Sequence, residues 1–131
     1  MRVLLDECLP RRLKRALFGH IDTVRRLALA LPEVTEGVCF GTPAFYMRKK
    51  LLAGLREDGE TLAIKADYAE REFWMLAKPE TFFLTDHYVG YPMLLVRLTT
   101  VQHADLQTLL SQAWRMIAPK RLIKSVDMAA E

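Results

Sequence analysis

One short loop gathers several of the side chains in this sequence that are able to bind a ligand. Residues 86–91 read DHYVGY and separate two segments that we expect to be strands. His87 is able to donate a hydrogen bond to a phosphate or a carboxylate. The alternative is structural, with Asp86 capping a turn and the tyrosines packing with their hydroxyl groups outward. The residues of this possible ligand loop are Asp86, His87, Tyr88 and Tyr91.

Basic side chains form a second candidate group, at the expected tip of a β-hairpin. Arg48, Lys49 and Lys50 are consecutive, and from a hairpin tip a β-ribbon is able to reach a phosphate backbone. Further basic residues follow the last strong helical pattern, where the negative end of a helix dipole also favours cations locally. The residues that we expect to contact DNA are Arg48, Lys49, Lys50, Lys65, Lys120 and Arg121.

The excess positive charge of the chain does not lie at this basic group. The formal net charge is +3. Residues 1–20 carry five basic and two acidic side chains, so the excess lies in that segment and the other residues are formally neutral. The basic character of the whole chain is therefore no argument that the rest of it binds nucleic acid.

The sequence contains no recognisable catalytic or metal-binding motif. His20, His87 and His103 lie far apart, and none has a second ligand at helical spacing. The serines belong to no nucleophile elbow, and the glycines form no phosphate-binding loop. We therefore expect a protein that is not an enzyme, with no metal site and no cofactor.

Cysteine usage and hydropathy indicate the compartment. Cys8 and Cys39 have no CxxC spacing, which favours free thiols in a reducing environment. The apolar stretches are far shorter than the roughly 20 residues that cross a bilayer. Asp6 and Glu7 interrupt the N-terminal apolar run before a secretory signal can form. We expect a cytoplasmic protein with no membrane partner.

Two helices are predicted in the first part of the chain. After a short strand at residues 2–5, a basic helix is expected to end at Gly19. Asp22 is predicted as the N-cap of a second helix, which Pro32 closes. The apolar residues of this second helix recur at helical spacing, so it has one stripe to bury.

A sheet interrupted by one helix is predicted next. Residues 38–66 have a period of two broken by turn residues, among them the hairpin signal Asp58–Gly59, which predicts a three-stranded meander. Asp67 and Glu70 form a capping box for a helix on which Phe73 is expected to face the core. Residues 82–84 and 93–98 predict two more strands.

The predicted elements together indicate an α+β fold. After the last strand comes a long amphipathic helix that carries Trp114, and the weak periodicity of residues 120–131 predicts a frayed end. The order is α-βββ-α-ββ-α, which favours an antiparallel sheet of about five strands with helices packed on one face. The helix from Asp22 and the helix with Trp114 should share that face, because each has one apolar stripe.

Residues 22–122 resemble the MmcQ/YjbR family. The resemblance depends on four segments in order: DTVRRLALALPE at 22–33, CFGTPAFYMRKKL at 39–51, ETFFLTDHYVGYP at 80–92 and AWRMIAPKRL at 113–122. It implies a CyaY-like α+β fold. DNA binding is the function that the family name usually carries, so the resemblance also implies DNA as a partner.

Residues 1–20 resemble the opening strand and helix of small PIN-like nuclease toxins. In that resemblance Asp6 would help to hold a divalent metal ion. Such a site needs several converging carboxylates, which one strand and one helix cannot supply. We therefore divide the chain into an appended segment at residues 1–20 and an MmcQ/YjbR-like domain at residues 21–131.

Three functional hypotheses follow, from different classes. The leading one is a non-enzymatic protein that binds DNA through the hairpin at residues 48–50. The second is a protein-interaction or small-ligand module that uses the loop at residues 86–91, and an apolar pocket under His87 would favour it. The last is a remnant metal-dependent nuclease that uses Asp6.

Overall fold

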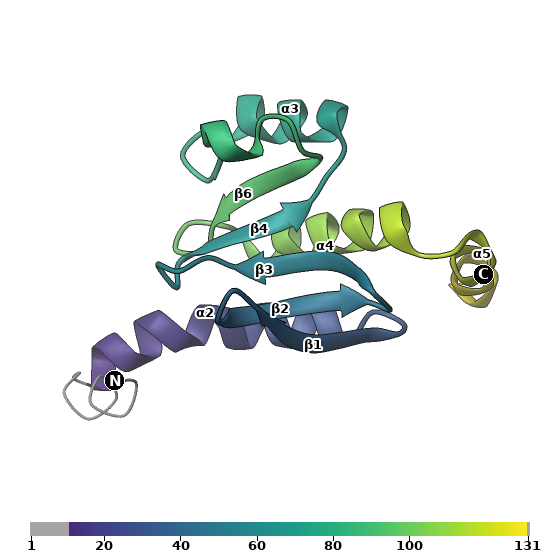
Figure 1. The fold of residues 1–131 in the computed structure, drawn as a ribbon, viewed down its shortest axis with the longest axis horizontal. Helices are drawn as coiled ribbons and strands as arrows, with labels where there is room; N and C mark the ends of the chain where they lie inside the picture. Colours follow the sequence, from purple (N-terminus) through teal and green to yellow (C-terminus); the bar gives the residue numbers. More distant parts are fainter. Residues whose placement is uncertain (1–10, 131) are drawn as a thin grey trace.

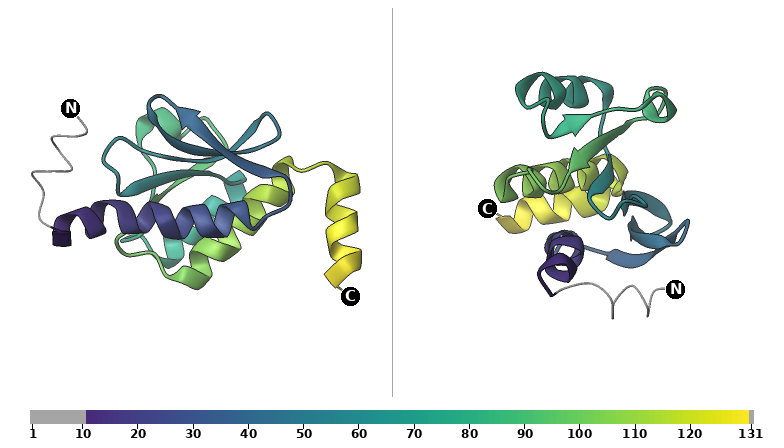
Figure 2. Two further views of the ribbon diagram at one scale, coloured as in Figure 1. Left: turned by 90° about the horizontal axis from the view of Figure 1, so that it is seen from below. Right: turned by 90° about the vertical axis from the view of Figure 1, so that its left-hand side faces the viewer.

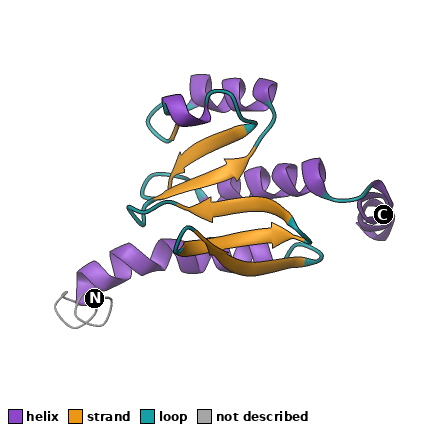
Figure 3. Cartoon of the chain, in the orientation of Figure 1, coloured by secondary structure: helices purple, strands orange, loops and turns teal. Residues whose placement is uncertain are grey.

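The computed structural model describes the backbone of residues 11–130 and the side chains of residues 20–128. Asp6, Cys8 and the strand predicted at residues 2–5 lie outside the described residues. The described chain has the predicted α+β fold (Figures 1 and 3). Its elements are α2 (Arg11–Leu29), β1 (Val34–Cys39), β2 (Thr42–Met47), β3 (Lys50–Leu55), β4 (Thr61–Lys65), α3 (Tyr68–Ala77), β5 (Phe82–Phe83), the 3₁₀ turn η1 (Asp86–Tyr88), β6 (Met93–Arg97), α4 (His103–Ile117) and α5 (Lys120–Ala130).

The sheet of the described chain is antiparallel and has six strands in the order β1-β2-β3-β4-β6-β5. The predicted fold, an antiparallel sheet of about five strands, is confirmed, with one strand more than expected. The additional strand belongs to the meander, which has four strands instead of three. The extra strand is β1, at the sheet edge. Most of its residues are exposed or half-buried, so it lacks the alternation of apolar and polar residues that identifies a buried strand.

Tight turns set the register of the first four strands. Between β1 and β2, Phe40 and Gly41 both have positive φ, 53° and 82°, as a type I′ hairpin turn requires. Between β3 and β4, Gly59 has φ 74°. The Asp58 carboxylate there accepts hydrogen bonds from the backbone N–H groups of Glu60 and Thr61. The hairpin predicted from Asp58 and Gly59 is therefore present.

The main core lies between the sheet and two helices, α2 and α4, which cover the same face (Figure 2). Trp114 of α4 is only 2% exposed, and its Nε1–H donates to the carbonyl oxygen of Pro32 at 2.9 Å. Leu27 of α2 packs against the same core. The prediction that these two helices share one face of the sheet is confirmed.

Two helix boundaries differ from the prediction. The helix α2 runs from Arg11 through Gly19 and Asp22 without a break, because a glycine inside a helix costs only about 1 kcal/mol and core contacts outweigh it. Residues 120–130 form α5 instead of a frayed end. Leu122 packs against the main core, which stabilises this helix beyond its own periodicity. The division of the chain at residue 20 stays a prediction, since residues 1–10 are not described.

The helix α3 has the predicted cap but a different buried face. The Asp67 side chain accepts a hydrogen bond from the Glu70 backbone N–H at 2.7 Å. Phe73, predicted to face the core, is 64% exposed, while Arg71 and Trp74 are buried. The reason is position: α3 packs at the end of the sheet against β5 and β6, so only one narrow side of it is covered.

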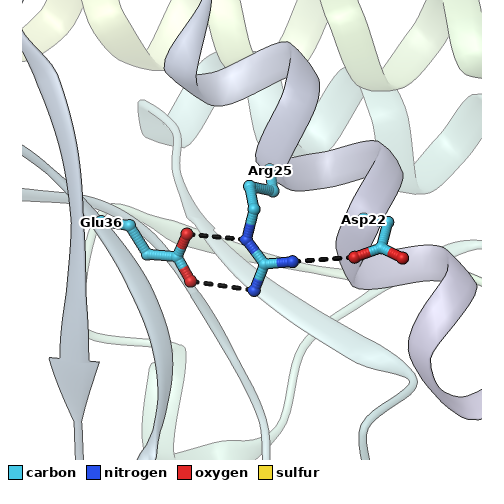
Figure 4. A network of polar contacts seen from close by, with 3 residues as sticks. All are labelled: Asp22, Arg25 and Glu36. Carbon is cyan, nitrogen blue, oxygen red and sulfur yellow. Dashed lines mark hydrogen bonds and ion pairs between the residues drawn. The ribbon is translucent and has the colours of Figure 1, made fainter.

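A charged cluster links α2 to the edge strand β1 (Figure 4). The Arg25 guanidinium donates to both carboxylate oxygens of Glu36, at 2.7 and 2.9 Å, and to Asp22 at 2.8 Å. These hydrogen bonds to Arg25 hold the pKa of the Glu36 carboxyl below its usual range. The cluster ties an otherwise exposed edge to the helix behind it.

We predict that Glu36→Gln lowers the free energy of unfolding at neutral pH by less than about 1 kcal/mol, because the pair is partly exposed. A carboxyl with a lowered pKa stabilises the folded state above its unfolded pKa of about 4.3 and loses that contribution as the pH falls through the folded pKa. The difference between wild type and variant should therefore shrink between about pH 5 and pH 3. Urea denaturation across that range measures it, and a constant difference would contradict the assignment.

Candidate functional site

The face of the sheet opposite α2 and α4 carries a second, smaller apolar cluster. Ala63, Met93 and Leu95 are its buried members, and Leu51, Phe83 and Tyr88 pack against them. This cluster is separate from the main core. The segment that follows β5 and contains η1 contributes Tyr88 to it, so the loop predicted as a ligand loop lies against the open face.

A hollow of about 420 Å³ lies between this loop and the strands β3 and β4. Its apolar lining includes Leu51, Gly54, Leu55, Ala63, Pro92 and Met93. Gly54 and Ala63 are partners across the β3–β4 pair, and neither has a side chain long enough to fill the space above it. A Cβ added at Gly54 would contact only the Cβ of Ala44 on the neighbouring strand β2, 3.7 Å away.

Aromatic and basic side chains form the rim of the hollow. His87, Tyr88 and Tyr91 all line it, and the His87 ring lies 4.8 Å from the Tyr88 ring. Arg56 donates a hydrogen bond to the Tyr88 hydroxyl at 2.7 Å. Lys65 lines the hollow as well. Three of the four residues of the predicted ligand loop therefore meet at one apolar hollow, whereas Asp86 begins η1 and does not line it.

The loop is held in place by Arg71, a buried residue of α3. Its guanidinium donates to the backbone carbonyl oxygens of Tyr91 and Val89, both at 2.7 Å, and to those of Tyr88 and Met93 at 3.2 and 3.3 Å. The guanidinium carbon also lies 4.6 Å from the centre of the Tyr68 ring. One side chain thus satisfies carbonyl groups along the whole loop.

The residues expected to contact DNA are divided between two places. Arg48 and Arg121 line a second hollow together with Glu33, and Arg48 forms an ion pair with Glu33 at 2.8 Å. That ion pair holds the pKa of the Glu33 carboxyl below its usual range. Lys49 and Lys50 are exposed beside Arg48, and Lys120 is exposed at the start of α5. Lys65 instead lines the hollow on the open face.

The described residues offer no grouping of metal ligands. Among the side chains of residues 20–128, no three His, Cys, Asp or Glu groups come together as they would around a metal ion. None of the described helices is long and apolar enough to cross a membrane. Cys39 is a half-buried free thiol at the edge of the hollow.

Sequence reasoning missed Arg56 and Arg71. The signal for Arg71 was weak but present: it lies three residues before Trp74 on α3, hence on the side of the helix that Trp74 buries. Nothing in the local sequence distinguishes Arg56, whose role depends on a hydrogen bond to a residue 32 positions away.

One family model and several known proteins are similar to this chain in sequence. The family model described as YjbR matches residues 29–116. An uncharacterized protein of Mycobacterium bovis, Mb2600, and one of Mycobacterium tuberculosis, Rv2570, are each 35% identical over 68 residues, 51% of this chain and 53% of theirs. The chain spans about half the length of the curated relatives it matches.

The fold has a counterpart among crystal structures. The Deinococcus radiodurans protein DR2400, described with a DUF419 domain, superimposes with a TM-score of 0.64 and 25% sequence identity. The match covers 76% of this chain and 79% of that protein. The residues that line the hollow, and Arg71, lie within the part of the chain that the family model matches.

We predict that Arg71→Met lowers the free energy of unfolding by about 1–3 kcal/mol, because the Val89 carbonyl loses its charged donor and the Tyr88 and Tyr91 carbonyls keep only backbone donors. Amide hydrogen exchange at residues 86–93 should accelerate more than exchange in α4. Arg97→Met is the matched control: Arg97 is exposed with its guanidinium 4.2 Å above the Phe83 ring, so its loss should cost less than about 1 kcal/mol. Equal effects of the two variants would contradict the role given to Arg71.

Proposed function

The chain belongs to the YjbR family, and we propose that it is a non-enzymatic protein that binds a small, largely apolar molecule in the hollow on the open face of its sheet. The observation that carries this proposal is the hollow itself, about 420 Å³ in volume, with His87, Tyr88 and Tyr91 on its rim. Ligand sites in proteins are typically hollows of about 300–1,000 Å³ with apolar walls and a few polar groups.

The wall of the hollow is preformed. Four hydrogen bonds from Arg71 to carbonyl groups hold the loop in one conformation, so a ligand would not have to pay for ordering it.

On the other side, Phe40 lines the hollow although its side chain is 98% exposed. Phe40 also has positive φ, which is strained for a bulky residue. A ligand in the hollow would cover this exposed ring.

We predict that the full chain binds the neutral probe N-phenyl-1-naphthylamine with a dissociation constant on the order of 0.1 mM, from about 0.3 kcal/mol for each non-hydrogen atom. Gly54→Val should weaken binding at least about tenfold, because the methyl groups of the valine would extend into the hollow. The variant should still fold, since β-branched residues are favourable in a strand such as β3. Fluorescence enhancement of the probe measures the affinity.

Thr35→Val is the matched control for this variant. Thr35 is exposed on β1 and does not line the hollow, so the control introduces a valine into a strand elsewhere without adding volume at the hollow and should leave binding unchanged. Urea denaturation checks that both variants are folded. A folded Gly54→Val protein that binds the probe as well as wild type would overturn the proposal.

DNA binding is a second proposed function, implied by the family resemblance and supported by one arrangement of side chains. Arg48 and Arg121 both line the second hollow, which is separate from the one on the open face, and the exposed residues Lys49 and Lys50 lie beside Arg48. Glu33 pairs with Arg48 and reduces the positive charge of this surface. The arrangement supports weak contact with phosphates and no recognition of a base sequence.

If this basic surface binds DNA, changing both Lys49 and Lys50 to Ala should weaken binding and lower the slope of log affinity against log salt concentration by about 0.9 for each lost phosphate contact. Glu33→Gln should strengthen binding, since it releases Arg48. Fluorescence anisotropy of a labelled duplex at two salt concentrations measures both effects. The control changes Arg26 and Arg97 to Gln, two exposed cations on other elements. Equal losses of DNA affinity in the control and in the lysine variant would indicate that net charge alone governs binding, and would contradict the proposal.

A further inference from the structure

The half-buried cations of the described chain differ in how they are paired. Among residues 20–128, the half-buried Lys and Arg side chains are Arg25, Arg56, Lys65 and Lys78. Arg25 pairs with Glu36 and Lys78 pairs with Asp105. Arg56 and Lys65 have no ion-pair partner in this part of the chain, and both line the hollow on the open face. The two half-buried cations without an ion-pair contact therefore meet at one site, although the charge of Arg56 helps to lower the pKa of the Asp58 carboxyl.

Lys65 is directed to the hollow by the alternation of β4. Leu62 and Ile64 belong to the main core, so Ala63 and Lys65 lie on the opposite, open face. Ala63 is part of the apolar cluster there, and Met93 is the partner of Lys65 on β6. Lys65 is half-buried at this hollow, and no described residue accepts a hydrogen bond from its ammonium group.

Arg56 and Tyr88 complete a set of donors. The Tyr88 hydroxyl accepts the hydrogen bond from Arg56, so its own O–H is available to donate to another group. Among the described residues, Glu57 is the one carboxylate that lines the hollow, and it is exposed. The polar groups at the rim are thus mainly donors and cations, which suits an acceptor that carries negative charge.

We infer that the ligand of the hollow is an organic acid, with an apolar body over Ala63 and Met93 and an anionic group paired with Lys65. This inference rests on the proposed function, since it names the chemical class of the molecule bound there. Arg56 and Tyr88 donate to the same anionic group from the loop side of the hollow. The anion replaces the acidic partner that the described chain itself does not provide.

Two probes that differ by one sulfonate group test this inference. They are the neutral N-phenyl-1-naphthylamine and its anionic analogue 8-anilino-1-naphthalenesulfonate. The full chain should bind the anionic probe about tenfold more tightly, as expected for a charge-assisted hydrogen bond that is partly desolvated. Lys65→Met keeps the apolar stem and removes the charge. It should weaken binding of the anionic probe about three- to tenfold while leaving the neutral probe unchanged, and the donors Arg56 and Tyr88 account for the preference that remains.

Lys124→Met is the matched control, because it removes the same charge from an exposed residue of α5 that does not line the hollow. It should leave the preference intact, and Gly54→Val should weaken both probes. Equal binding of the two probes, or a preference that is undiminished in Lys65→Met, would overturn the organic-acid inference while the proposed apolar site stands. Failure of wild type to bind either probe, or undiminished binding in Gly54→Val, would overturn both.

Discussion

The arrangement of the open face depends on one buried guanidinium. Arg71 is 6% exposed and has no carboxylate partner among the described residues. Its charge is compensated by the carbonyl oxygens of the loop and by the ring of Tyr68. A buried charge without such partners would be very costly, so α3 and the loop have to keep this relative position. Through that constraint, a residue of α3 positions the rim of a hollow that it does not line.

The hollow results from an unequal distribution of helices and side-chain volume over the two faces of the sheet. The long helices α2 and α4 pack on one face, where large residues such as Phe45 and Leu62 are fully buried in the core. In the part of the chain that the structure describes, the loop held by Arg71 covers the open face. Because Gly54 and Ala63 lie opposite each other on β3 and β4, the covering loop bridges a space that the side chains of these two residues leave open.

Much of the fold follows from local patterns in the sequence, and the parts that do not are those that depend on distant contacts. The cap at Asp67, the Asp58–Gly59 hairpin and the buried face of Trp114 involve residues a few positions apart, and each was predicted. The continuity of α2 through Gly19 and the burial of Arg71 depend on partners elsewhere in the fold. For the candidate site, the sequence singled out His87, Tyr88 and Tyr91, which line the hollow, and it grouped Lys65 with the residues expected to contact DNA. It could not place Lys65 at the hollow, because strand alternation shows which face a residue occupies and not what covers that face.

The two proposed surfaces differ in how their cations are compensated, and this difference favours the hollow as the binding site. Arg48 already has a carboxylate partner in Glu33, so binding a phosphate there would first require that ion pair to be weakened. Lys65 has no ion-pair partner among the described residues, so an incoming anion would not have to displace one. The excess positive charge of the chain lies in residues 1–20, outside the segment that the family model matches. Attraction of polyanions to that excess charge would therefore be a property of the N-terminal segment, whereas the unpaired cation in the hollow belongs to the family domain itself.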